Sequence, residues 1–171
     1  MQDKANNVMN NFQRVGSVSN ACVGRDFESA AQKHFQKQKV LLGSNFSILV
    51  GVTAEKKNRQ FDLGSQDPPV LVECKSHRWT AGGNVPSAKI TVWNEAMYYF
   101  HLAPPRFRKV LFVLRDYSEK RQESLAAYYM RRYSHLIPKD VEILEYDDKT
   151  GEVIEVLKIG STRIGFSSEA P

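Results

Sequence analysis

The run Lys109 to Arg115 (KVLFVLR) restricts the possible folds of this chain more than any other segment, because its five central residues are all apolar. A strand with one wet face alternates apolar and polar residues, whereas an unbroken run is typical of a central strand covered on both faces. The sequence therefore predicts an α/β domain in which helices cover a sheet.

Apolar residues recur at helical spacing in three other parts of the chain. These parts are residues 23–38, 87–102 and 122–135. The second helix is expected to stop before Pro104 and Pro105, because proline lacks the backbone N–H and restricts the residue before it.

The remaining apolar segments have the length and the β-branched composition of strands. They cover residues 46–52, 59–64, 69–76, 141–146 and 153–159. The order predicts an αβββαβ core with a mixed central sheet flanked by helices, followed by an added C-terminal helix and β-hairpin. We expect a single domain over residues 21–160, a flexible or weakly helical N-terminal arm over 1–20, and a polar tail over 161–171.

Composition limits the class of protein. The 171 residues are enough for one domain, and the two cysteines, Cys22 and Cys74, are too few for a disulfide framework. No apolar run approaches the roughly 20 residues of a membrane-spanning helix. We therefore expect an intracellular protein without a membrane segment. The net charge of +5 permits an anionic partner such as nucleic acid but does not require one.

Two acidic residues are predicted to face each other across the second and third strands. If the hairpin turns on Asp67 and Pro68, opposed residues have numbers that sum to 135, and Asp62 then lies opposite Glu73. Two ionised carboxylates on directly opposed residues repel each other, and a divalent cation between them removes the repulsion. Carboxylate oxygens suit magnesium or manganese.

Lys75 lies two residues after Glu73 and so projects from the same face of its strand. An ammonium beside a metal-bound water can orient that water and offset charge on a phosphate, which fits phosphodiester hydrolysis. The alternative is an ordinary solvated Glu-Lys ion pair, which stabilises by about 0–1 kcal/mol. The alternating apolar face opposite these charges and a possible third carboxylate, Glu28 on the first helix, favour the hydrolytic interpretation.

The strand order, together with Asp62 and the Glu73-Cys74-Lys75 sequence, resembles the PD-(D/E)XK nuclease superfamily, which has the restriction-endonuclease-like fold. The resemblance covers about residues 24–115, and Phe61 stands where the family name has proline. It implies that Asp62 and Glu73 bind Mg²⁺ or Mn²⁺, with the Cys74 carbonyl as a further ligand, and that Lys75 assists the attacking water. Glu28 matches the place of a first-helix glutamate that lies near the metal in this family.

The function implied by this resemblance is a magnesium-dependent DNA endonuclease, with a homodimer as a possible arrangement for cutting two strands. The alternative is a nucleic-acid-binding or assembly module that keeps the fold without hydrolysis. The substrate type is not specified by the sequence.

Seven further residues are candidates for weak nucleic-acid contacts. They are Lys56, Lys57, Arg59, His77, Arg78, Trp79 and Lys89. Trp79 lies in a glycine-rich loop and could stack on a base or wedge into DNA. It could equally anchor that loop or contact a second subunit.

Overall fold

The computed structural model describes residues 20–157, so the expected arm and tail lie outside the described residues, apart from Asn20 at the start of the first helix. The elements follow the expected order through the first six. They are α1 (Asn20–Lys37), β1 (Gly43–Val50), β2 (Lys57–Gln66), β3 (Pro69–Lys75), α2 (Ser87–Leu102), β4 (Arg108–Leu114), β5 (Tyr117–Ser118), β6 (Glu123–Ser124), α3 (Leu125–Tyr133), the 3₁₀ turn η1 (Ser134–Leu136), β7 (Val141–Tyr146) and β8 (Val153–Leu157).

Six strands form one mixed sheet in the order β1-β2-β3-β4-β7-β8. The pairs β3–β4 and β4–β7 are parallel, and the outer pairs β1–β2, β2–β3 and β7–β8 are antiparallel. The parallel pairs require crossovers, which α2 and α3 supply. The expected mixed α/β class with helices flanking the sheet is confirmed.

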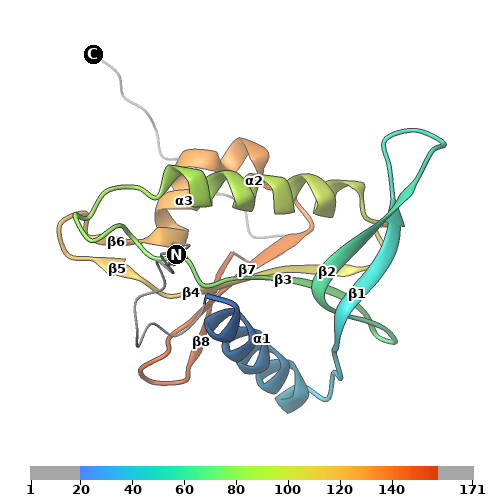
Figure 1. The fold of residues 1–171 in the computed structure, drawn as a ribbon, viewed down its shortest axis with the longest axis horizontal. Coiled ribbons are helices and arrows are strands. Elements are labelled where there is room, and N and C mark those ends of the chain that lie inside the picture. The colour runs from blue at the N-terminus through green and yellow to red at the C-terminus, as the bar shows by residue number, and fades with distance from the viewer. Residues whose placement is uncertain (1–19, 158–171) are drawn as a thin grey trace, which may run out of the picture.

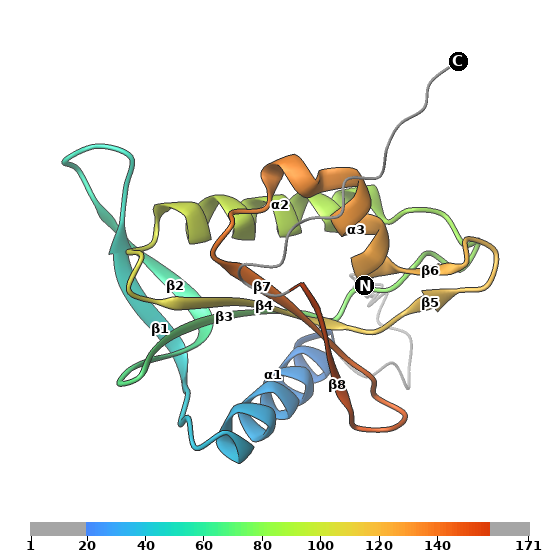
Figure 2. The same cartoon turned by 180° about the vertical axis from the view of Figure 1, so that it is seen from behind.

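Helices cover both faces of the sheet, with α1 on one side and α2 and α3 on the other (Figures 1 and 2). The α1 side is packed around Phe27 and Phe35, and the α2 side around Trp93 and Phe100. Within residues 20–157, no helix is both long enough and apolar enough to cross a membrane.

The apolar run that predicted a central strand is β4, which lies between β3 and β7. Its residues Val110 and Phe112 face α1, and Leu111 and Val113 face α2, with all four fully buried. The unbroken run is therefore explained by a strand that has a core on each side.

The third helix begins later than the sequence predicts. Gln122, the expected first residue, has a left-handed φ of 54°, and residues 123–124 pair with β5. The Ser124 side chain accepts a hydrogen bond from the Ala127 N–H, and this cap starts the helix at Leu125. The predicted start at Gln122 was wrong because periodicity alone did not locate the cap. The first strand also differs, since it starts at Gly43 rather than Phe46.

The two faces of β2 differ from the expected alternation. Phe61 and Leu63 lie on either side of Asp62 in the sequence, so strand alternation predicts that they share a face. In the structure, Phe61 packs on the α2 side and Leu63 on the α1 side. The ladder with β3 runs only from Leu63 to Gln66, whereas the ladder with β1 extends back to Lys57. The β1–β2 hairpin turns away from the sheet plane beyond that point (Figure 1). The expectation for Phe61 and Leu63 was wrong because it assumed a flat strand.

The Phe46 side chain of β1 packs directly on Gly64 of β2 near this bend. A Cβ at Gly64 would lie 2.5 Å from the Phe46 ring, whereas a Cβ at its strand partner Gly43 would meet only a carbonyl oxygen at 3.8 Å. Gly64→Ala should therefore lower the free energy of unfolding by about 1–3 kcal/mol. Gly43→Ala, the matched control, should change it by less than about 0.5 kcal/mol. Urea denaturation measures both, and equal effects would contradict this packing.

Candidate carboxylate and lysine site

Asp62 lies at the point where β2 leaves β3. The hairpin register is as predicted, with Gln66 paired to Pro69 and Leu63 to Val72, but the ladder ends at that last pair. The Asp62 carboxylate accepts a hydrogen bond of 2.7 Å from the Cys74 N–H. It thereby supplies the partner that the diverging strand no longer offers to this backbone donor. The prediction that Asp62 lies directly opposite Glu73 in the ladder is therefore wrong, because the strands diverge beyond Leu63 and Val72. The Asp62 side chain instead reaches β3 through the Cys74 N–H.

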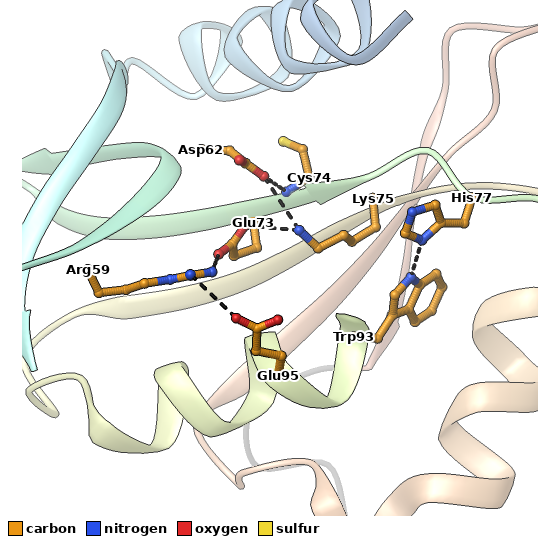
Figure 3. A network of polar contacts seen from close by, with 8 residues as sticks. All are labelled: Arg59, Asp62, Glu73, Cys74, Lys75, His77, Trp93 and Glu95. Carbon is orange, nitrogen blue, oxygen red and sulfur yellow. Dashed lines mark hydrogen bonds and ion pairs between the residues drawn. The ribbon is translucent and has the colours of Figure 1, made fainter. Parts of the chain in front are cut away.

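Glu73 is almost fully buried, with 2% of its side chain exposed, and cations contact both of its oxygens. Arg59 Nη2 donates to Oε1 at 2.8 Å, and Lys75 Nζ donates to Oε2 at 3.1 Å. Lys75 Nζ also lies 3.9 Å from Asp62 Oδ2. Figure 3 shows Lys75 between the two carboxylates. The structure therefore brings together the three residues that the sequence singled out.

The electrostatic balance of this cluster leaves Glu73 harder to ionise than an ordinary glutamate. Burial is the main cause that raises the pKa of Glu73, and the neighbouring Asp62 carboxylate raises it further. Lys75 and Arg59 act in the opposite direction without cancelling the effect. Burial therefore favours the neutral, protonated form of Glu73 more than in an ordinary glutamate.

Glu28 on α1 belongs to the same electrostatic neighbourhood. Its side chain is half-buried, and burial raises its pKa. The negative charge of Asp62 raises this pKa too, whereas Lys75 lowers it. Glu28 therefore lies close enough to Asp62 and Lys75 for their charges to act on it, and its place in the site stays a prediction.

Arg59 takes part in this cluster in a way that the sequence did not reveal. Its guanidinium lies 4.0 Å from the centre of the Tyr99 ring, and Nη1 lies 3.6 Å from Glu95 Oε1. Both of these partners project from α2. Arg59 thus links β2, the Glu73 carboxylate and α2, instead of extending with Lys56 and Lys57 into solvent. Glu95 and Tyr99 are four residues apart, so they lie next to each other on one face of α2, and this spacing was the sequence pattern that could have indicated a shared partner.

Cys74 presents its backbone to the site and its thiol to the other side of the sheet. The side chain packs against the α1-side core, together with Val70 and Val72. Burial is the main cause that raises the pKa of the Cys74 thiol, and nearby carboxylates add to it. The thiol therefore stays protonated and is no nucleophile, whereas the role of the Cys74 carbonyl as a metal ligand stays a prediction.

The donor chemistry of this cluster suits a hard divalent cation, because it offers oxygen ligands of high charge. As the side chains stand, however, residues 20–157 contain no group of three or more His, Cys, Asp or Glu side chains arranged to hold a metal ion. Both oxygens of Glu73 already have cationic partners. A cation would therefore have to displace Lys75 or Arg59 from one Glu73 oxygen.

Of the remaining candidates, His77 lies nearest to the cluster, two residues beyond the end of β3. The Trp93 indole donates a hydrogen bond of 2.9 Å to His77 Nδ1. Burial and the charges of Lys89 and Lys75 lower the pKa of His77 to about 4. The sequence predicted Trp93 only as a core residue, so this second role was missed.

Arg78 and Trp79 fasten the loop after β3 to the segment after β4. Arg78 bridges Asp116 and Asp148 at 3.3 and 2.6 Å. The Trp79 backbone N–H donates to the Asp116 carboxylate at 2.7 Å, and its indole donates to the Asp116 carbonyl at 3.0 Å. Of the roles that the sequence left open for Trp79, anchoring the loop is the one that these contacts support.

The three candidate lysines are all exposed. Lys56 and Lys57 lie on the β1–β2 hairpin, beyond Arg59 and away from Asp62. Lys89 lies in the first turn of α2 and contributes to the field at His77. Lys89 is therefore the lysine of this set whose charge acts on His77.

Comparison with known proteins identifies no relative. No family model, no curated protein and no solved structure matches this chain. The interpretation of the site therefore depends on its own geometry and chemistry.

The raised pKa of Glu73 predicts how stability depends on pH. The native state holds the Glu73 proton more tightly than the unfolded state does, so this residue's contribution to stability is lost as the pH rises through the native pKa. Glu73→Gln removes this pH dependence, because a glutamine side chain does not ionise. The unfolding free energy of the parent, minus that of E73Q, should therefore decrease between about pH 4 and pH 7.

Urea titrations in EDTA at a series of pH values measure this difference. Glu95→Gln is the matched control, because Glu95 also contacts Arg59 but has an exposed side chain. Its curve should run parallel to that of the parent. A difference between parent and E73Q that grows with pH would show that the cations around Glu73 outweigh its burial.

Proposed function

We propose that this chain is a magnesium-dependent DNA endonuclease with the restriction-endonuclease-like fold. The observation that carries the proposal is the convergence of Asp62, Glu73 and Lys75 where β2 diverges from β3. Burying a charged lysine and a charged carboxylate together costs desolvation free energy. Such a cluster is therefore weak evidence for stability and a candidate for a functional site.

The element order supports the fold part of the proposal. The first six elements run α1, β1, β2, β3, α2 and β4, which is the αβββαβ order of that superfamily. The acidic residues and the lysine lie on β2 and β3, and Glu28 comes from α1, so each residue occupies the element that the resemblance implies.

The residues have distinct roles in this proposal. The carboxylates of Asp62 and Glu73 and the carbonyl of Cys74 bind Mg²⁺ or Mn²⁺, and Glu28 adds negative charge next to them. The metal supplies an activated water and neutralises charge on the phosphate. Lys75 orients the attacking water through its ammonium and balances the charge that develops on the phosphate. A homodimer would bring two such sites to the two strands of a duplex.

Lys75→Met should abolish cutting, because it removes the only ammonium that contacts both carboxylates among the described residues. We expect the rate to fall by a factor of about 10² or more. The assay follows linear, circular, single-stranded and branched DNA with Mn²⁺ and with EDTA. Lys109→Met is the matched control, since Lys109 is a buried lysine on the neighbouring strand, paired with Asp140 at 2.6 Å.

The control should cut like the parent if it is folded, as judged by circular dichroism. Cutting by K75M at the parent rate would refute the assignment of Lys75. Equal losses in K75M and K109M would indicate damage to the sheet instead of loss of a catalytic group.

A non-catalytic nucleic-acid-binding module is the second candidate function. The full pairing of Glu73 with Arg59 and Lys75 favours it, because the cluster is neutralised from within the chain. The two functions differ in metal binding. For the endonuclease, calorimetry with Mn²⁺ should show binding that Asp62→Asn weakens at least about tenfold, as expected for the loss of a charged ligand. Absence of metal binding, together with salt-sensitive DNA binding, would establish the module.

A further inference from the structure

The His77 ring lies at the edge of the carboxylate cluster, beside the Lys75 side chain (Figure 3). It is half-buried and nearly parallel to the fully buried Trp93 indole, with 22° between the ring planes. The hydrogen bond from Trp93 Nε1 to His77 Nδ1 fixes the orientation of the imidazole. Because Trp93 belongs to the core face of α2, the His77 ring is held by the rigid part of the domain.

This hydrogen bond also fixes where the His77 proton resides. An indole N–H can only donate, so Nδ1 must be the unprotonated nitrogen that accepts. The ring proton of neutral His77 is therefore on Nε2. The low pKa of about 4, which burial and the charges of Lys89 and Lys75 produce, keeps the ring neutral at physiological pH.

Nε2–H has no acceptor among the described residues of the chain. Within residues 20–157, the hydrogen bond to Trp93 is the one side-chain hydrogen bond of His77. The charged groups that act on the ring are Lys75 at the end of β3 and Lys89 in the first turn of α2, and both are positive. A fixed neutral donor on which two ammonium groups act is suited to an anionic oxygen.

We propose that His77 binds a DNA phosphate through Nε2–H, next to the phosphate at which the carboxylate cluster acts. This inference depends on the proposed function, because it identifies the anion as a phosphodiester. It makes His77 a substrate-binding residue and Trp93 the positioning residue that sets its tautomer.

The experiment compares three substitutions at position 77 by fluorescence anisotropy of a short labelled DNA duplex, with EDTA present so that no cutting occurs. A Gln side chain can place its amide N–H near the position of Nε2, whereas an Asn side chain reaches only the position of Nδ1. H77Q should therefore keep the parent affinity within about threefold, and H77N and H77F should each lose about tenfold, the value of a hydrogen bond to a charged group.

Salt dependence distinguishes a neutral donor from a cation. Between about 50 and 200 mM NaCl, the slope of log K against log salt should be the same for H77F and the parent. Lys89→Met should reduce the slope by about 0.9, because it removes one ion contact with the backbone. A reduced slope in H77F would overturn the neutral donor and indicate an imidazolium contact.

Nitrogen NMR of the histidine rings provides a measurement on the unsubstituted protein. His77, assigned by its absence in H77Q, should show the Nε2–H tautomer without titrating between about pH 5 and 8, and Trp93→Phe should leave the tautomer unfixed, because Nδ1 then lacks its donor. Adding the duplex should shift the Nε2 signal.

An Nε2 signal unchanged by bound duplex, or parent affinity in H77F, would overturn this inference and leave the endonuclease proposal intact. A parent protein that binds no duplex at low salt would overturn both.

Discussion

The divergence of β2 from β3 beyond Leu63 and Val72 is the constraint on which the rest of the site depends. It leaves the Cys74 N–H without a strand partner, and an unpaired backbone donor inside a protein is costly. Asp62 satisfies that donor, and doing so holds its carboxylate beside Lys75. The same divergence opens the α2 face of the sheet, where Arg59 reaches the buried Glu73. One break in a ladder thus assembles a cluster of charges.

Much of this arrangement follows from short-range patterns in the sequence. The turn at Asp67 and Pro68 fixes the hairpin register, and the period of two along β3 assigns Val72 to one face and Glu73 to the other. These two facts are enough to predict that Asp62, Glu73 and Lys75 are neighbours, whereas the divergence of β2 decides how Asp62 reaches the other two. The unbroken apolar run of β4 predicted its central position in the same way, because burial on both faces removes alternation.

The features that sequence reasoning missed arise from tertiary contacts. Arg59 and Glu95 meet only because the bend in β2 lets Arg59 reach α2, and no local pattern records a bend. The same bend places Phe61 and Leu63 on different faces. The role of Trp93 as a hydrogen-bond donor was missed because its helical spacing predicts a core residue, and that spacing does not report a partner for the indole N–H. The start of α3 depended on a side-chain cap at Ser124, which periodicity does not report.

The charges around Glu73 explain how one cluster is compatible with both proposed functions. Arg59 and Lys75 neutralise Glu73, and this pairing makes the buried carboxylate tolerable without any added ion. Neither cation depends on Glu73 alone, however. Arg59 has Glu95 within 3.6 Å, and Lys75 has Asp62 within 3.9 Å. Each can therefore remain paired while one oxygen of Glu73 is released to another cation. The second partners lower the cost of such an exchange, which a metal site at Glu73 would require.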